Sequence, residues 1–267
     1  VSTFGKPDTS NFEGWFSAAN FLQYSNALRV VRVQNSSVSN ATESGSAFVI
    51  KNTIDYTNNY AAGQASVGLW AARTAGAHGN SLQISTCPSA TAYEEVNKTT
   101  VADAAMAVGD TVVTVSSATG ISAGDIVNFG DQYEYRVISV STNDLNIVRK
   151  EEPAYFGTSE SSGLHQAPTN GAQVRRRWKY YDLFNKAPGT SPAVSAKGGS
   201  GDELHIVVID EDGELTGTKG DVLETFEAVS KASDAKDAQG NVNYYPDVIY
   251  KSSNYIYWMD HNAGGSN

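Results

Sequence analysis

The chain has 267 residues, of which 40% are hydrophobic and 18% charged, enough to bury one large core or two ordinary ones. Its formal net charge of −10 excludes nucleic acid and anionic membrane surfaces as expected partners, because the summed field repels phosphate groups. The single cysteine, Cys87, excludes an intrachain disulfide, and no apolar run reaches the roughly 20 residues that span a bilayer.

The first third of the chain predicts a helix packed on a sheet. Residues 8–11 offer several N-cap side chains, and the apolar residues of 12–22 recur at helical spacing. The β-branched run 28–33 then predicts a buried strand. A polar loop over 35–46, a short strand at 47–50 and an alternating strand at 82–86 are expected to follow.

The middle of the chain changes character and predicts an inserted β-rich domain. Short apolar runs are separated by Gly, Asp and Asn, which is typical of a small antiparallel barrel or sandwich. The expected strands are 112–115, 126–129, 133–137 and 145–148. Gly- and Ser-rich loops are expected at 155–171 and 189–201.

The last third predicts a hairpin, with strands at 204–209 and 223–229, and a further aromatic strand at 255–258. The acidic run 210–214 between the hairpin strands offers hard oxygen ligands for calcium, but it lacks the ligand ladder of an EF-hand. Asp212 and Gly213 instead suit a turn that needs a positive φ. We therefore expect a solvated turn, with no metal and no cofactor.

A cation-rich run is the strongest candidate for a binding surface. Alternation along a strand would place Arg175, Arg177 and Lys179 on one face. The mixture of cations with Tyr180 and Tyr181 is found in single-strand nucleic-acid binders, but this chain is acidic overall. The sequence favours a subunit interface in which these three cations meet carboxylates of a neighbouring copy.

Catalytic motifs are missing from the sequence. Its four histidines, His78, His165, His205 and His261, lie far apart, and no Gly-x-Ser-x-Gly elbow or phosphate loop occurs. We therefore expect no catalytic residues and no enzyme. A hydrolase built on a carboxylate pair from distant segments stays open as an alternative.

Five segments carry a further signal: residues 1–7, the string SAANFLQYSNALRVVRV at 17–33, the turn at 76–82, and the stretches 221–226 and 254–257. Together they resemble the tail sheath proteins of large contractile-tailed phages. The resemblance covers roughly the first third and the last quarter of the chain, in the family's order. Residues 99–171 carry no family motif.

The resemblance implies a mixed α/β (α+β) fold in two domains. A sheath core domain would be built from 1–98 and 172–267, with the outward-facing β-rich domain 99–171 inserted. It also implies a virion subunit, assembled in the host cytoplasm, that stacks as hexameric rings around a tail tube. Such a sheath contracts without ATP and drives the tube through the host envelope for genome ejection. The partners would be other sheath subunits, the tube protein and the baseplate.

The chain departs from the complete family pattern. The N-terminal arm and the C-terminal tube-facing domain are not recognised, so we expect a large fragment that is monomeric by itself. The main alternative is a phage adhesin or carbohydrate-binding module, in which the 14 tyrosines and 4 tryptophans would supply stacking surfaces.

Overall fold

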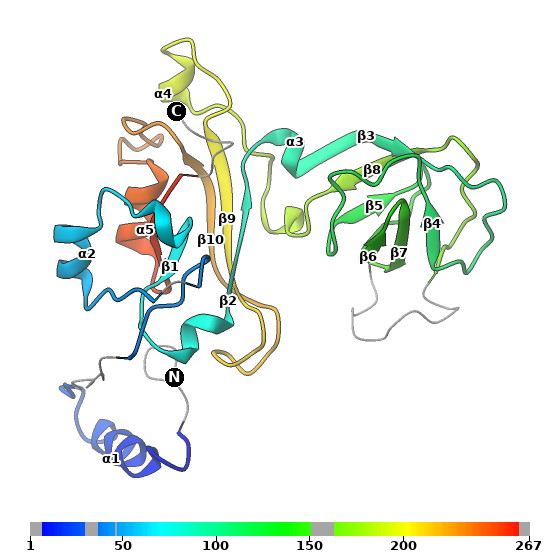
Figure 1. Ribbon diagram of the computed structural model, residues 1–267. Coiled ribbons are helices and arrows are strands. Elements are labelled where there is room, and N and C mark those ends of the chain that lie inside the picture. Colours follow the sequence, from blue (N-terminus) through cyan, green and yellow to red (C-terminus); the bar gives the residue numbers. More distant parts are fainter. Residues whose placement is uncertain (1–6, 30–36, 46, 151–162, 262–267) are drawn as a thin grey trace. The chain divides into compact units, whose positions relative to one another are not determined.

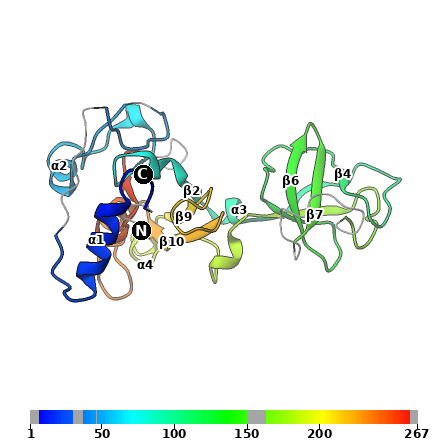
Figure 2. The ribbon, with the colours of Figure 1, turned by 90° about the horizontal axis from the view of Figure 1, so that it is seen from below.

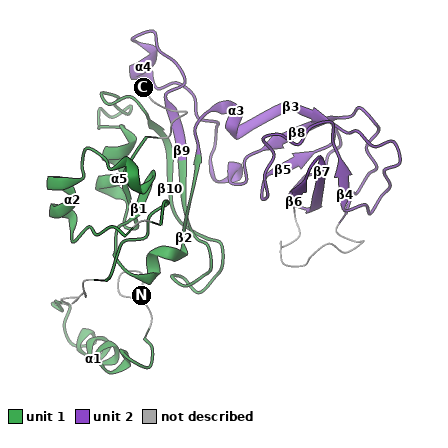
Figure 3. Ribbon diagram, in the orientation of Figure 1, with its two compact units in different colours: residues 1–86, 206–267 green, residues 87–205 purple. Residues whose placement is uncertain are grey.

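The computed structural model describes residues 7–29, 37–45, 47–150 and 163–261 (Figure 1). They form a mixture of helices and mostly antiparallel sheets, which confirms the expected mixed class. The chain divides into two compact units, residues 1–86 with 206–267 (unit 1) and residues 87–205 (unit 2) (Figure 3). The expected domain boundaries at 98/99 and 171/172 stay a prediction.

Unit 1 combines short helices with two small sheets. Its elements are α1 (Phe12–Leu22), α2 (Thr53–Asn59), β1 (Trp70–Ala72), β2 (Leu82–Cys87), β9 (Glu203–Asp210), β10 (Asp221–Ser230), α5 (Tyr245–Ser252) and β11 (Ile256–Trp258). One sheet pairs β1 with β11, and the other has the order β10-β9-β2. Strands β2 and β9 carry the chain across the border into unit 2.

An aromatic stack forms the centre of unit 1. The ring of Tyr56 on α2 lies 4.2 Å from that of Tyr257 and 5.7 Å from that of Tyr250, nearly parallel to both. The Arg73 guanidinium lies 4.6 Å from the Tyr257 ring. The Tyr56 hydroxyl donates a 2.7 Å hydrogen bond to the Trp258 carbonyl, and burial raises its pKa to about 12. The stack therefore joins α2, α5 and β11.

Unit 2 is built on one six-stranded antiparallel sheet of order β3-β8-β5-β6-β7-β4 (Figures 1 and 2). Its elements are α3 (Ala90–Tyr93), β3 (Glu94–Thr100), β4 (Val112–Thr114), β5 (Ile126–Asn128), β6 (Tyr135–Ser141), β7 (Asp144–Arg149), β8 (Gln173–Arg177) and α4 (Pro192–Ser195). The four strands expected in the middle of the chain are confirmed as β4 to β7, within a few residues at their ends.

The sheet of unit 2 curls around its own core but does not close. Register shifts in β3 and β6 bend the sheet, and an isolated bridge between Val101 and Val115 brings the two edges together at one end. Val113, Val127, Tyr135, Leu145 and Ile147 are fully or almost fully buried between them. No closed barrel forms among the described residues, so the expected barrel or sandwich is not confirmed.

Two expectations for the first third are not met. Helix α1 forms as predicted, but none of its residues is buried, so packing on a sheet is absent from the described structure. Residues 47–50 are not a strand, because the buried Asn40 bonds them instead: its amide nitrogen donates to the Phe48 carbonyl, and its side-chain oxygen accepts from Ile50. Most of the strand expected at 28–33 lies outside the described residues.

The strands of the predicted hairpin are confirmed as β9 and β10, but a longer loop over 211–220 replaces the tight turn. The buried carboxylate of Asp210 holds this loop. It accepts hydrogen bonds from the amides of Gly213, Leu215 and Thr216 and from the Thr216 hydroxyl, at 2.7 to 3.1 Å. Gly213 has the expected positive φ, +85°. The Asp210 carboxylate, one of the groups considered above as calcium ligands, is therefore hydrogen-bonded by donors of its own loop.

Asp210→Asn should destabilise the chain by about 2–4 kcal/mol, because a buried acceptor of four hydrogen bonds loses its charge and gains an N–H group among donors. Urea unfolding followed by tryptophan fluorescence measures the change. Asp212→Asn, an exposed neighbour in the same loop, is the matched control and should change the midpoint little. Equal midpoints for the two variants would contradict the role of Asp210.

Candidate functional site

The candidate site begins with the alternation of side chains along β8. Val174 lies in the core of unit 2, and Arg176 points to the same side. The Arg176 guanidinium makes two 2.9 Å hydrogen bonds to the buried Asp125 carboxylate and a third, of 2.6 Å, to the Ala92 carbonyl. Arg176 is thus held in place by its partners, and Arg175 and Arg177 lie on the opposite face of the strand.

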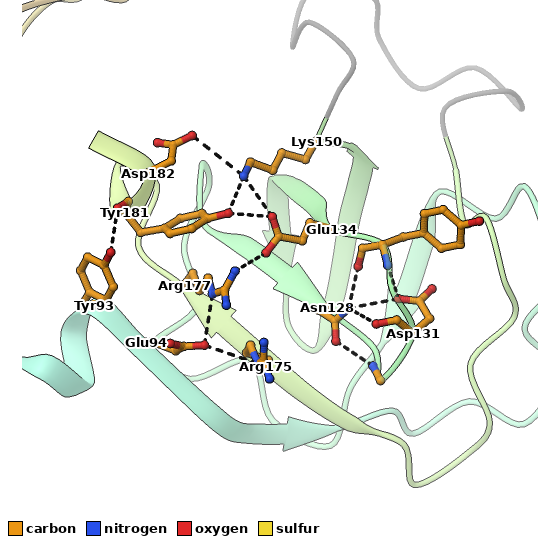
Figure 4. A network of polar contacts seen from close by, with 12 residues as sticks. Tyr93, Glu94, Asn128, Asp131, Glu134, Lys150, Arg175, Arg177, Tyr181 and Asp182 are labelled. Atoms are coloured by element: carbon orange, nitrogen blue, oxygen red, sulfur yellow. Dashed lines mark hydrogen bonds and ion pairs between the residues drawn. The ribbon is translucent and has the colours of Figure 1, made fainter. Parts of the chain in front are cut away.

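Arg177 is the centre of a network of charges (Figure 4). Its guanidinium donates to Glu94 at 3.1 Å and to Glu134 at 2.5 Å. The other Glu134 oxygen accepts from Lys150 at 3.0 Å and from the Tyr181 hydroxyl at 2.7 Å. Lys150 also donates to the Tyr181 hydroxyl, so the network joins β3 and β8 to the residues directly before β6 and directly after β7, and to the segment after β8.

The network fixes the charge states of its members. Burial alone would raise the pKa of Glu134, but the hydrogen bonds from Tyr181 and Lys150 and the nearby cations lower that pKa below its ordinary value. Burial likewise opposes the charge on Lys150, and the bonds to Tyr181 and Glu134 outweigh it and raise the pKa of Lys150. Both groups are therefore charged throughout the neutral range.

Arg175 is less fully paired than its neighbours. Its Nε lies 3.4 Å from Glu94, in an ion pair that it shares with Arg177, and no hydrogen bond reaches this buried nitrogen. The side chain as a whole remains 41% exposed. Lys179 lies beyond the end of β8, exposed, with its ammonium 4.9 Å from the Tyr180 ring centre. Arg175 and Arg177 thus share a face, and both contact a carboxylate of their own chain.

An open depression of about 800 Å³ lies beside this network. It is lined by the turn 128–134, by Lys150 and by Arg175. Hydrogen bonds within the turn hold its shape: the Asn128 side chain donates to Asp131 and to the Tyr133 carbonyl, and the Asp131 carboxylate accepts from the Tyr133 amide (Figure 4). The depression is therefore formed by a turn that is already ordered.

The sequence indicated Tyr181 only as part of the cation-rich run and did not indicate Glu94, Glu134 or Lys150 as site residues. They come from separate segments and meet only through the strand register, which sets Glu94 opposite Arg177. One local signal was present: Glu134 precedes the buried Tyr135, so alternation directs it away from the core.

Other candidate chemistry receives little support from the described part of the chain. No three His, Cys, Asp or Glu residues are grouped there as metal ligands would be. Cys87 is buried, and His261 contacts the hydroxyls of Tyr244 and Tyr245 through its two ring nitrogens. None of the helices in this part has the length and apolar character needed to cross a bilayer.

Comparison with known proteins places the chain beside structural proteins of phage tails. It is similar to the tail sheath protein of Salmonella phage ViI, with 26% identity over 288 aligned residues that cover 96% of this chain. The chain spans 41% of the length of that relative. No family model matches the chain, and no solved structure gives a significant match. The similarity supports the tail sheath class and a structural role.

Glu134→Gln should lower the free energy of unfolding by about 1–3 kcal/mol at pH 7, because three donors lose a charged acceptor. The lowered pKa means that the unfolded chain takes up the proton first as the pH falls. The contribution of Glu134 is therefore complete above the ordinary carboxylate pKa, about 4.3, and is lost below it. Urea unfolding of the wild type and the variant at pH 7 and at pH 3 measures the difference in free energy of unfolding at each pH.

The matched control is Glu95→Gln, which removes a pair with Lys98 three residues along the same strand. Surface pairs of this kind contribute about 0–1 kcal/mol. If wild type and Glu134→Gln differed as much at pH 3 as at pH 7, the charged network would not be the source of the effect.

Proposed function

We propose that the chain is a section of a contractile phage tail sheath subunit. In this proposal the full-length subunit stacks as hexameric rings around the tail tube and contracts to drive the tube through the host envelope. The similarity to a tail sheath protein across 96% of the chain carries the proposal. Because the chain spans 41% of that relative, the tube protein and baseplate as partners, assembly in the host cytoplasm and the monomeric state of this section are proposals too.

Internal rigidity supports a mechanical role. In a contracting assembly, rigid subunits move into new contacts, so the free energy is released between subunits and not by chemistry within them. The aromatic stack of unit 1 and the charged network of unit 2 each tie several elements together within their own unit. Such units transmit displacement and deform little, because packed interiors have low compressibility.

The exposed apolar side chains of α1 support association with another surface. Phe12, Phe16, Phe21 and Leu22 are each about half exposed, at 46% to 56%, and no residue of α1 is buried. Phe12 and Phe16, one turn apart, share a face of α1, and exposed apolar side chains that lie together mark interaction sites in soluble proteins. We include α1 among the surfaces through which sheath subunits assemble.

A subunit interface through Arg175, Arg177 and Lys179 stays a proposal, and the three residues suit it unequally. Arg177 would have to exchange two close carboxylates of its own chain for a new one. Lys179 is exposed and Arg175 partly so, which leaves them better placed to meet a neighbouring copy. The adhesin alternative is favoured by one observation, the polar depression beside Arg175.

Negative-stain electron microscopy of the full-length parent protein tests the sheath proposal. We expect striated hollow tubes or stacked rings, because a sheath subunit polymerises with copies of itself. Dispersed compact particles at every protein concentration would overturn the proposal and favour the adhesin alternative.

The role of α1 is tested in the same protein with Phe12→Ser and Phe16→Ser combined. We expect at least about a tenfold loss of assembled material in sedimentation, because two anchors of an apolar contact are replaced by polar groups. Ile54→Ser on α2, where the side chain is 72% exposed, is the matched control and should assemble normally. Equal assembly of both variants would remove α1 from the interface.

A further inference from the structure

We propose that the open depression of unit 2, formed by the turn 128–134 with Lys150 and Arg175, binds a saccharide that carries a carboxylate. This goes beyond the sheath role and does not depend on it. Three features support it: the lining of the depression, the order of its turn and the incomplete pairing of Arg175.

Among the described residues the lining is polar and contains no aliphatic side chain. It combines amide, carboxylate, ammonium and guanidinium groups with Tyr133. The centres of protein interfaces are depleted in Lys, Glu and Asp, so this lining does not suit the buried centre of a protein interface. Sugar hydroxyls both donate and accept hydrogen bonds, and they match a surface of mixed donors and acceptors. The volume, about 800 Å³, also falls in the range of ligand sites.

The turn is ordered before any ligand arrives. The Asn128 side-chain oxygen accepts from Gly130, and the two Asp131 carboxylate oxygens accept from the Tyr133 amide and the Tyr135 hydroxyl. The Tyr135 hydroxyl also accepts from the His165 amide, so the turn is joined to the segment before β8. Fewer groups must be immobilised on binding, which favours the affinity of a small ligand.

The aromatic ring of the depression is supported from within the protein. Tyr133 is half-buried, and its ring stacks on His165 with a centroid separation of 4.1 Å and an interplanar angle of 22°. A ring held in this way presents a flat apolar body together with a polar hydroxyl. The C–H face of a pyranose can pack on the exposed part of such a ring.

Arg175 gives the site its preference for a carboxylate. Three cations, Arg175, Arg177 and Lys150, meet the carboxylates of Glu94 and Glu134 at 3.4 Å or closer. Lys150 also lies 3.9 Å from the carboxylate of Asp182. Arg175 shares Glu94 with Arg177, its Nε makes no hydrogen bond, and 41% of its side chain is exposed. A planar guanidinium suits a carboxylate, which it can bind through two parallel hydrogen bonds.

The same depression should not collect anions in general. Asp131 and Glu134 place two negative charges beside Lys150 and Arg175, so the charged lining groups among the described residues sum to zero. The whole chain is acidic. A ligand must therefore combine a carboxylate for Arg175 with hydroxyl groups for the turn, as a sugar acid does.

The test is a titration of the 267-residue chain with trigalacturonic acid, a neutral galactose trimer and acetate. Two-dimensional amide NMR reports binding and its location. We expect trigalacturonic acid to bind at least about tenfold more tightly than the neutral trimer, with shifts centred on Gly130 and Tyr133. Acetate alone should give no saturable shift.

Two variants and a control locate the ligand groups. Arg175→Gln should abolish the preference for the acidic trimer, and Tyr133→Ala should weaken binding of both trimers by about tenfold. Lys179→Gln removes a cation just after the same strand, outside the depression, and should bind as the wild type does. Melting curves of each variant confirm that it is folded.

Three outcomes would overturn the proposal. The first is the absence of saturable shifts with either trimer up to about 10 mM. The second is equal binding of the acidic and neutral trimers, which would refute the role of Arg175. The third is self-association of the chain that Arg175→Gln abolishes, because the depression would then be a contact between copies and not a saccharide site.

Discussion

The ion pair between Arg176 and Asp125 determines which side of β8 carries the candidate site. The two side chains are 13% and 5% exposed, and removing one partner of such a pair typically costs about 3–5 kcal/mol, because the other charge stays buried. With Arg176 held on the core side, strand geometry directs Arg175 and Arg177 to the opposite side. The side of β8 on which Arg177 joins the charged network and Arg175 lines the depression therefore depends on this one ion pair.

Sequence patterns predicted the strands that are buried because their own side chains are apolar. β9 is buried along its whole length, and its apolar run was clear from the sequence. β3, with the sequence EEVNKTT, was missed because it is a polar edge strand of its sheet. The opposite error occurred at 47–50, an apolar segment that was predicted as a strand but is not one. The Ile50 amide, which would bond to a neighbouring strand, donates instead to the buried side chain of Asn40.

The site could be predicted in part for the same physical reason. Alternation along one strand is local, so the shared face of Arg175 and Arg177 was accessible from the sequence. Their carboxylate partners were not, because Glu94 lies on another strand and Glu134 on a third segment. Only the register of the folded sheet brings these charges within hydrogen-bonding distance. The register between distant segments therefore decides which cations of β8 are paired within the chain and which can meet a ligand or a partner.

The path of the chain between the two units has an evolutionary consequence. The chain leaves unit 1 at 86/87 and returns at 205/206, and these points fall in β2 and β9, which are neighbours in one sheet. Neighbouring strands lie about 4.8 Å apart. A recombination event could thus replace everything between these points with any domain whose own termini are equally close, without changing the strand order around the junction. The pairing of β2 with β9 would then be the same for every domain carried at this junction.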